Sequence, residues 1–488
     1  MIQMQKVRPA VTVLLLAVAA PSLAADRFEE IRSYIKAQMV AESVPSISVA
    51  VAKDGKILWE ESFGWADREK RIEATPHTMY SLASISKPIT TTGLMTLVQA
   101  GKVDLDKPIN DYLGNAKLRA RVGDAKDATV RRVANHTAGL PTYYQFFYAD
   151  EPYSRPSMDE TILRYGNLVT APGETYEYSN LGFGVLDYVI SRVSGMSYPE
   201  FMRREVFLPL GLTRTSVDIG PGLEDFAATR YGTDGLPIPF YDFDHPGASA
   251  IFSSAHDLVR FGMFHLKAHL KEQKPILSDA SIDEMHKRTA GTPENGYSIG
   301  FANSTKNNYE IVAHSGGMGG VHTQMQLYPS DKLVIVVLAN SATRLPSQAA
   351  DRIANKMLAK WPLSPERKWP DPEPFKPTDS LLGTWKGTLS TYVKDVPVEL
   401  RFLPSGDVHA KFGDQLTTLV NRPNFKDGVF TGNLVARIGT PDTERNPYTV
   451  GLQLRLRGDV LNGDAAAEGD RSTRVRNALA HWIELKKQ

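Results

Sequence analysis

Six prolines between residues 362 and 377 divide the 488-residue chain into two parts with different hydrophobic patterns. Proline cannot continue a helix and cannot donate to a sheet, so residues 361–378 are predicted to form a stiff, extended linker. Before the linker, helical and strand-like patterns are mixed. After it, apolar residues alternate with others, as in 396–402 and 450–456, and helical patterns are nearly absent. The sequence therefore predicts two domains, 25–360 and 379–488, of which the second is all-β.

Residues 1–24 have the three parts of an export signal. Lys6 and Arg8 precede the apolar run 10–20, and Ser22-Leu23-Ala24 provides small residues for a cleavage site. The run is shorter than the roughly 20 residues that a membrane-spanning helix needs. We therefore expect a periplasmic or secreted mature protein without a membrane span.

The charge balance and the lack of cysteine exclude several functions. The chain has 56 Lys and Arg against 55 Asp and Glu, a formal net charge of +1, so no basic excess points to a nucleic-acid partner. A cysteine count of zero excludes disulfides, thiolate metal sites and a thiol nucleophile.

Periodicity predicts a mixed α and β arrangement for the first domain. A helix is expected over 28–40, two strands over 46–51 and 57–63, further strands over 309–314, 323–328 and 333–339, and a closing helix over 347–360. The strand at 333–339 is almost entirely apolar, which is typical of the centre of a sheet.

Ser84 and Lys87 stand three residues apart at the start of a predicted helix that runs towards Gly101. Residues at this spacing lie on one helical face, so the lysine can reach the hydroxyl. The start of a helix also favours a developing negative charge. A partly desolvated lysine can lose its proton and activate a hydroxyl nucleophile. The same pattern also fits a helix cap followed by a solvated lysine.

Two further stretches carry polar groups suited to catalysis. Tyr178-Ser179-Asn180 precedes an apolar helix and can present a phenol and an amide on one side of a turn. A cation nearby would lower the pKa of the tyrosine and let it relay protons. His314 ends a strand that runs into Gly316 and Gly317, where backbone N–H groups can approach a substrate because no Cβ intervenes. Alone, these stretches also fit a capped helix and a surface histidine.

Together, in this order, the three stretches resemble the serine β-lactamase and penicillin-binding-protein superfamily, and within it the class C β-lactamase-like serine hydrolases. The matches are Ser84 to Lys87 for Ser-x-x-Lys, Tyr178 to Asn180 for Tyr-x-Asn, and His314 to Gly316 for Lys/His-Thr/Ser-Gly. The resemblance covers residues 28–360. It implies an α+β fold, in which a sheet with flanking helices and a helical lobe enclose a cleft, and it implies that the second domain is a lipocalin-like barrel.

The resemblance also implies a mechanism without metal or cofactor. Ser84 would form an acyl-enzyme with a small-molecule or peptide substrate, while Lys87 and Tyr178 share the acid and base work. The backbone N–H groups of Ser84 and Gly317 would form the oxyanion hole, and Asn180 would hold the substrate amide.

One departure from the β-lactamase pattern bears on the substrate. His314 stands where β-lactamases carry lysine, and a histidine need not be charged near neutral pH. Peptides containing D-residues and small esters or amides are therefore favoured over β-lactams. The alternative is a penicillin-binding or sensing protein without turnover, in which the β domain is the interaction surface; a β-lactamase is a lesser alternative.

A rival nucleophile lies in Gly296-Tyr297-Ser298-Ile299-Gly300, which fits the Gly-x-Ser-x-Gly elbow of α/β-hydrolases. That motif requires a helix directly after the serine, whereas the polar stretch 302–308 follows here. Ser298 is therefore predicted to be an ordinary strand residue.

Overall fold

The computed structural model describes residues 27–268, 270–292, 294–363, 373–469 and 477–488. The predicted export signal, 1–24, lies outside these residues, as does part of the predicted linker. The last helix of the first domain ends at Met357, and the first strand of the second domain begins at Gly383. The predicted boundaries at 360 and 379 lie between these two elements.

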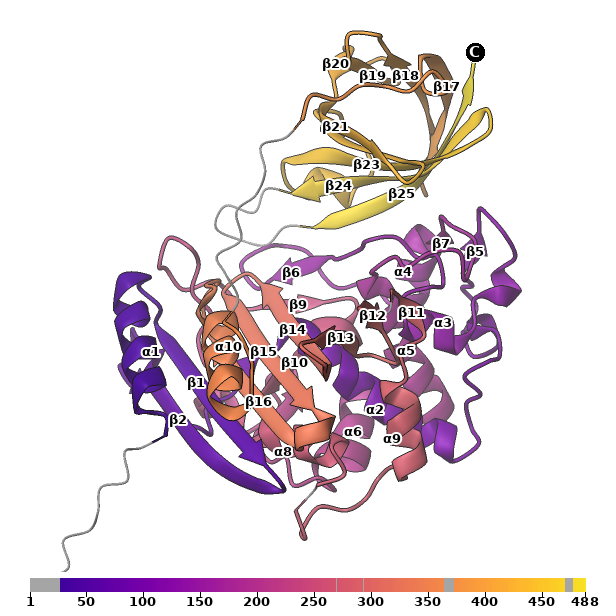
Figure 1. Ribbon diagram of the computed structural model, residues 1–488. Helices are drawn as coiled ribbons and strands as arrows, with labels where there is room; N and C mark the ends of the chain where they lie inside the picture. The colour runs from indigo at the N-terminus through magenta and orange to yellow at the C-terminus, as the bar shows by residue number, and fades with distance from the viewer. Residues whose placement is uncertain (1–26, 269, 293, 364–372, 470–476) are drawn as a thin grey trace, which may run out of the picture.

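The first domain is built around a nine-stranded antiparallel sheet (Figure 1). Its order is β11 (Ala290–Gly291), β12 (Asn295–Tyr297), β13 (Ala302–Lys306), β14 (Tyr309–Met318), β15 (Val321–Tyr328), β16 (Leu333–Ala339), β1 (Ser46–Lys53), β2 (Lys56–Asp67) and β3 (Ile72–Glu73). The apolar strand β16 is central and has the predicted bounds. The predicted strand 309–314 is longer than expected, because β14 continues through both glycines and pairs with β15 as far as Met318.

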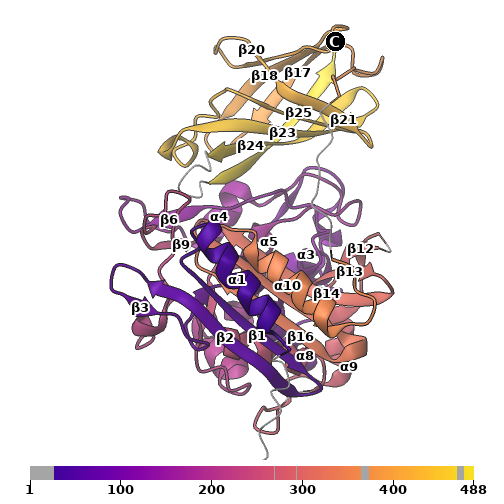
Figure 2. The same ribbon diagram turned by 60° about the vertical axis from the view of Figure 1, so that its left-hand side comes forward.

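Both faces of the sheet are covered by helices because β16 is apolar on both sides. Leu333, Ile335 and Val337 pack in a cluster with α1 (Glu29–Ala41) and α10 (Leu345–Met357), which lie side by side across the sheet in Figure 2. The alternate residues, Val334 among them, pack in the larger core with α8 (Ala255–His265) on the opposite face. Successive side chains of a strand point to opposite faces of the sheet, so the residues of β16 contribute alternately to two hydrophobic cores.

The segment between β3 and β11 forms the helical lobe. Its helices are α2 (Ser86–Gln99), α3 (Val130–Ala134), α4 (Met158–Tyr165), α5 (Asn180–Ser194), α6 (Tyr198–Met202), α7 (Pro246–Ser249), α8 and α9 (Asp279–His286). Its short strands are β4 (Tyr80–Ser81), β10 (Ile251–Ser253) and β8 (Thr215–Val217) in one sheet, and the pairs β5 (Arg119–Ala120) with β7 (Asn167–Leu168) and β6 (Phe146–Tyr148) with β9 (Tyr241–Phe243). Within the described part of the chain, every helix is too short or too polar to cross a bilayer.

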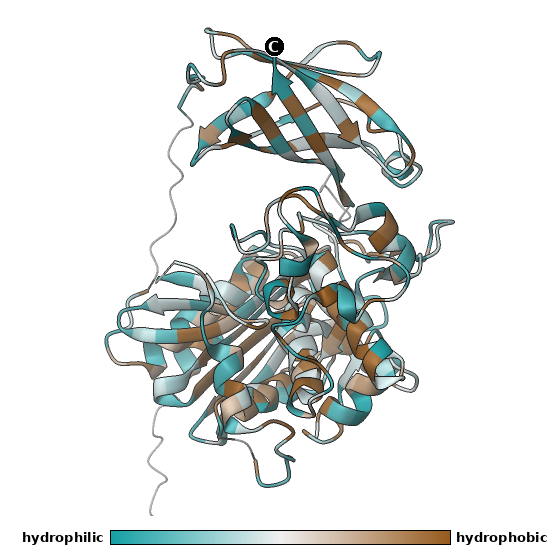
Figure 3. Ribbon diagram, turned by 90° about the vertical axis from the view of Figure 1, so that its right-hand side faces the viewer, coloured by the Kyte–Doolittle hydropathy of each residue, from teal (hydrophilic) through white to brown (hydrophobic). Residues whose placement is uncertain are grey.

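The second domain is a nearly closed antiparallel barrel, as predicted. Its strand order is β20 (Thr418–Leu419), β19 (Val408–Phe412), β18 (Asp395–Phe402), β17 (Gly383–Ser390), β25 (Ala478–Lys487), β24 (Val460–Gly469), β23 (Tyr448–Arg457), β22 (Val429–Leu434) and β21 (Asn421–Lys426). Hydrophobic and hydrophilic residues alternate along its strands in Figure 3. Trp385 and the alternate apolar residues of β18 fill its interior.

Candidate active site

Ser84 lies in a single 3-10 turn, Ala83–Ile85, directly before α2. Ala83 has φ +49°, in the left-handed region that costs a non-glycine residue about 1 kcal/mol or more. Strain of this kind persists only where the surroundings hold it, and Ala83 is fully buried against β14. The hydroxyl of Ser84 therefore stands on a rigid turn at the mouth of the helix rather than within it.

Lys87, in the first turn of α2, is fully buried and contacts three oxygen atoms. Its Nζ lies 3.2 Å from Ser84 Oγ, 2.7 Å from Asn180 Oδ1 and 3.1 Å from the backbone oxygen of Ala248. No carboxylate of the described residues lies within ion-pair distance of it. Burial therefore holds the pKa of Lys87 well below its ordinary value of 10.5.

Tyr178 reaches Ser84 from the other side. It is the penultimate residue of the irregular segment 171–179 before α5, and its hydroxyl donates to Ser84 Oγ at 2.9 Å. Its ring packs on the ring of His136 at 4.4 Å between centroids. Burial raises the pKa of Tyr178 above its ordinary value of 10.0, and the hydrogen bond to Ser84 lowers it by less. The prediction that a nearby cation would lower this pKa is therefore wrong, because desolvation outweighs every other effect.

Asn180 is the first residue of α5, and its carboxamide links two parts of the site. Oδ1 accepts from Lys87, and Nδ2 donates to the backbone oxygen of Tyr143 at 3.0 Å. The amide therefore orients the lysine; the sequence suggested only contact with a substrate amide.

His314 lies in the middle of β14 and is buried beside Tyr297. Its Nε2 is 2.8 Å from the Tyr297 hydroxyl, and burial, with a smaller contribution from Lys87, lowers the pKa of His314 to about 3. An uncharged imidazole follows at neutral pH.

Gly316 and Gly317, on the same strand, have different surroundings. A Cβ on Gly316 would lie 2.1 Å from the backbone oxygen of Leu82, so this glycine lets β14 pack against the Ser84 turn. A Cβ on Gly317 would meet nothing within 4 Å, and Gly317 lines the clefts on both sides of Ser84. Only Gly317 is placed for contact with a substrate.

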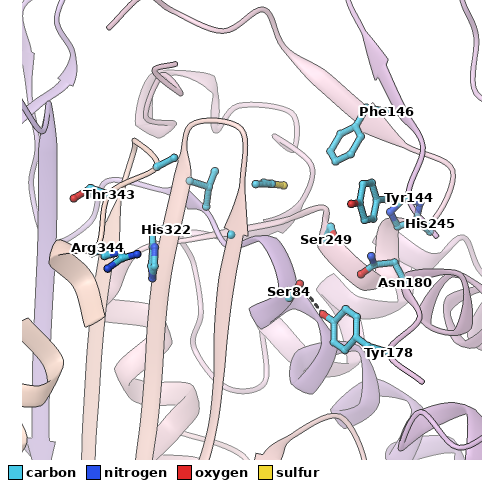
Figure 4. Close-up of a pocket in the computed structure, with 14 residues that line it drawn as sticks. Ser84, Tyr144, Phe146, Tyr178, Asn180, His245, Ser249, His322, Thr343 and Arg344 are labelled. Carbon is cyan, nitrogen blue, oxygen red and sulfur yellow. Dashed lines mark hydrogen bonds between the residues drawn. The ribbon is translucent and has the colours of Figure 1, made fainter. Parts of the chain in front are cut away.

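Two clefts meet at Ser84, Tyr178 and Gly317. One, of about 620 Å³, has Tyr144 and Phe146 on one side and His322 and Arg344 across from them (Figure 4). The other, of about 510 Å³, is lined by Tyr176, Tyr297 and His314, among others. The cleft residues outside the three motifs were not predicted from the sequence. The aromatic residues within 143–148 could have indicated one wall of the cleft.

The structure tests the expectation for Ser298. Ser298 was predicted to be a strand residue, but it lies one residue after β12, in a turn, and its buried hydroxyl donates to the backbone oxygen of Phe301 at 3.3 Å. No helix follows it before β13. In the described ranges, no group of three or more His, Asp or Glu is arranged to hold a metal ion.

This fold and this site define the class of protein. The β-lactamase family model matches residues 31–360, so the chain belongs to the β-lactamase family, within the serine β-lactamase and penicillin-binding-protein superfamily, whose members are serine hydrolases.

Two relatives share less than 30% sequence identity with this chain over the aligned residues. Penicillin-binding protein 4* of Bacillus subtilis is 28% identical over 322 residues, which are 60% of this chain and 67% of that protein. Protein flp of Staphylococcus aureus is 27% identical over 325 residues, 64% of this chain and 63% of that protein. The chain therefore spans about two thirds of the length of these relatives.

Among solved structures, SurE in complex with D-Leu is similar to this chain with a TM-score of 0.64 at 21% identity. The match covers 94% of this chain and 100% of the SurE chain. The octameric penicillin-binding protein homologue from Pyrococcus abyssi has a TM-score of 0.59 at 22% identity and covers 92% and 99%. A class C β-lactamase has a TM-score of 0.59 at 18% identity but covers 68% of this chain. Likeness at these identities supports the fold, and the first two extend it over the barrel.

Proposed function

We propose that the protein is an exported serine hydrolase that acts through an acyl-enzyme on Ser84, with D-residue-containing peptides or small esters and amides as substrates. Ser84 Oγ attacks the carbonyl carbon, its proton passes to Lys87, and the leaving group departs with a proton returned through Lys87 and Tyr178. Water then hydrolyses the ester and restores the serine.

The contacts of Lys87 Nζ carry this proposal. A neutral amine has two N–H groups and one lone pair. Two of the three oxygens around Nζ, Asn180 Oδ1 and the Ala248 carbonyl, can only accept, so they take both N–H groups. The lone pair is left for the third neighbour, the hydroxyl of Ser84 at 3.2 Å. Burial, which depresses the pKa of Lys87, favours this neutral form.

Tyr178 takes the complementary role. Its raised pKa keeps the phenol protonated, and the hydroxyl already donates to Ser84 Oγ. The same O–H can turn to a leaving group that departs from the carbon bonded to Oγ. Lys87 is accordingly the base of the acylation step and Tyr178 the acid.

The oxyanion would lie between the backbone N–H groups of Ser84 and Gly317. Gly317 lines both clefts beside Ser84 and has open space where a side chain would be. Donors of this kind contribute roughly 3 to 4 kcal/mol each to transition-state stabilisation.

The clefts and His314 bear on the substrate class. Aromatic side chains line both clefts, which suits an acyl or leaving group with apolar surface. His314, with a pKa of about 3, supplies no fixed cation where β-lactamases use lysine, and this disfavours β-lactams. SurE, a protein of the same fold, has been solved with D-Leu, and this supports the choice of substrates that contain D-residues.

Covalent labelling and turnover test the proposal. The full mature chain should gain the mass of one fluorophosphonate adduct, Ser84→Ala should gain none, and the control Ser298→Ala should label like the parent. Turnover is then screened with D-alanyl peptides, p-nitrophenyl esters and a chromogenic cephalosporin, and we expect the cephalosporin to be the poorest substrate. Equal labelling of Ser84→Ala would refute the nucleophile. A penicillin acyl-enzyme that persists for hours, with no product from any substrate, would support a sensing protein instead.

A further inference from the structure

The segment that carries Tyr178 is attached to the C-terminal barrel through two carboxylates that the proposed chemistry does not use. Glu174 accepts from Arg457 Nη2 at 2.7 and 2.6 Å, and Arg455 Nε lies 3.6 Å from the same carboxylate. Glu177, directly before Tyr178, accepts from Gln453 Nε2 at 2.9 Å. The barrel is thus hydrogen-bonded to the residues that stand one and four positions before Tyr178.

The three barrel residues belong to one rigid surface. Gln453, Arg455 and Arg457 are alternate residues of β23, so their side chains emerge from the same face of the strand. β23 is paired along its length with β24 and along most of it with β22, which holds its backbone on both sides. This face of β23 is therefore a fixed support for whatever binds to it.

The segment itself depends on such support. Residues 171–179 contain no regular helix or strand, so no backbone ladder of their own fixes their shape. On the side away from the barrel, Glu177 N donates to His136 O at 2.8 Å, and Ser179 N donates to His136 Nδ1 at 3.1 Å. The segment is thus held between the backbone and ring of His136 on one side and β23 on the other.

The barrel also holds the aromatic wall of the larger cleft. Tyr144 and Ala478, the first residue of β25, exchange backbone hydrogen bonds of 3.0 and 2.8 Å. Phe146 N donates to Asn477 Oδ1 at 2.8 Å, and Phe146 O accepts from Arg445 at 2.9 Å. Figure 1 shows the barrel lying over β6 and α4, and the contacts of Phe146 are made at the start of β6.

We propose that β23 of the C-terminal barrel is part of the catalytic apparatus: Arg457 and Gln453, through Glu174 and Glu177, are positioning residues that hold the hydroxyl of Tyr178 against Ser84. The proposal rests on the proposed function, because it concerns the rate at which Ser84 is acylated. Small displacements of a catalytic group reduce the rate steeply, whereas an ion pair as exposed as Arg457 (32%) and Glu174 (26%) adds little to stability. Catalysis and stability should therefore respond differently when the pair is broken.

A charge exchange in the full-length protein tests this. In Arg457→Glu, Ser84 should react about tenfold more slowly with a fluorophosphonate or a p-nitrophenyl ester. Glu174→Arg alone should behave similarly, and the double variant should return to within about twofold of the parent. Lys386→Glu is the control, because it makes the same charge change on the barrel within a surface pair with Glu399 on β18. The milder Gln453→Ala, which removes only the bond to Glu177, serves if the charge variants fold poorly.

The measurements separate positioning from general structure. We expect the rate constant of the p-nitrophenol burst at saturating ester to fall, while the ester concentration that half-saturates the burst stays nearly unchanged. The thermal midpoint of Arg457→Glu should stay close to that of the Lys386→Glu control. Acylation at the parental rate in Arg457→Glu and Gln453→Ala would overturn the proposal. A slower rate that the double variant does not restore, or that follows a lower thermal midpoint, would overturn it as well. Failure of the proposed function looks different, since then the parent itself would not be labelled at Ser84.

Discussion

Lys87 shows how burial sets the chemistry of a single residue. Its amine is enclosed by three oxygens that carry no formal charge, and the pKa is held well below 10.5 because no carboxylate offsets the desolvation. Only the neutral amine has a lone pair for the proton of Ser84. The folded protein therefore loses its base as pH falls through the depressed pKa and regains it as pH rises.

The acylation rate should consequently have an acidic limb. Below the pKa of Lys87, the rate constant for the burst of p-nitrophenol from an ester should fall about tenfold per pH unit. His314→Gln should keep this limb, because the pKa of His314, about 3, lies below the range of the assay. Disappearance of the limb in His314→Gln would assign the titrating base to the histidine and contradict the assignment to Lys87.

At the scale of an element, β14 uses two neighbouring glycines for different purposes. Gly316 faces the backbone of Leu82 and permits close packing of the strand on the Ser84 turn. Gly317 faces the open cleft. The first glycine therefore serves packing, and the second serves access.

Alanine at each position should separate these effects. Gly316→Ala must push β14 away from the turn, and we expect it to lower the free energy of unfolding by about 2 kcal/mol and to slow acylation. The free energy of unfolding of Gly317→Ala should stay within about 0.5 kcal/mol of that of the parent. Its KM should nevertheless rise, because the new methyl group enters the cleft. Urea unfolding and steady-state ester kinetics measure both. Equal losses of stability in the two variants would show that the packing argument is wrong.

At the scale of the whole molecule, Arg445 of the barrel is buried in the first domain. Its side chain is 3% exposed, lies over the rings of Phe147 and Tyr153, and hydrogen-bonds to the backbone of Phe146. Asp442 nearby accepts from Arg164 and from the hydroxyls of Tyr165 and Tyr392. A junction of this kind should couple the unfolding of the two domains.

Arg445→Met tests that coupling. The parent should unfold in one cooperative transition, and the variant should lose about 3 kcal/mol of unfolding free energy, because Glu151 and the Phe146 carbonyl lose a buried partner. Arg437→Met is the matched control, since Arg437 is 75% exposed and its loss should leave the midpoint unchanged. Urea denaturation followed by circular dichroism gives the comparison. A variant as stable as the control would mean that the junction does not couple the domains.

The sequence predicted best those elements whose burial is regular. β16 has the predicted bounds, and α1 was predicted to within one residue at each end, because alternation and helical periodicity report directly on which side of an element is buried. β14 was predicted too short, since glycine reads as the end of a strand although the ladder with β15 continues through it. Ser298 was wrongly assigned to a strand because a short apolar stretch does not reveal where its turn begins.

The sequence alone determined the elements at the two ends of the first domain, the all-β second domain and the nearness of Ser84 to Lys87, since these depend on neighbours within a few turns of chain. The pairing of Tyr178 with Ser84 came from resemblance, because no local rule joins residues so far apart. Tertiary structure decided the directions in which the pKa values of Lys87, Tyr178 and His314 shift, which follow from burial, and the contacts of β23 with Glu174 and Glu177. Burial and contacts between domains depend on which faces pack together, and local sequence patterns do not specify that.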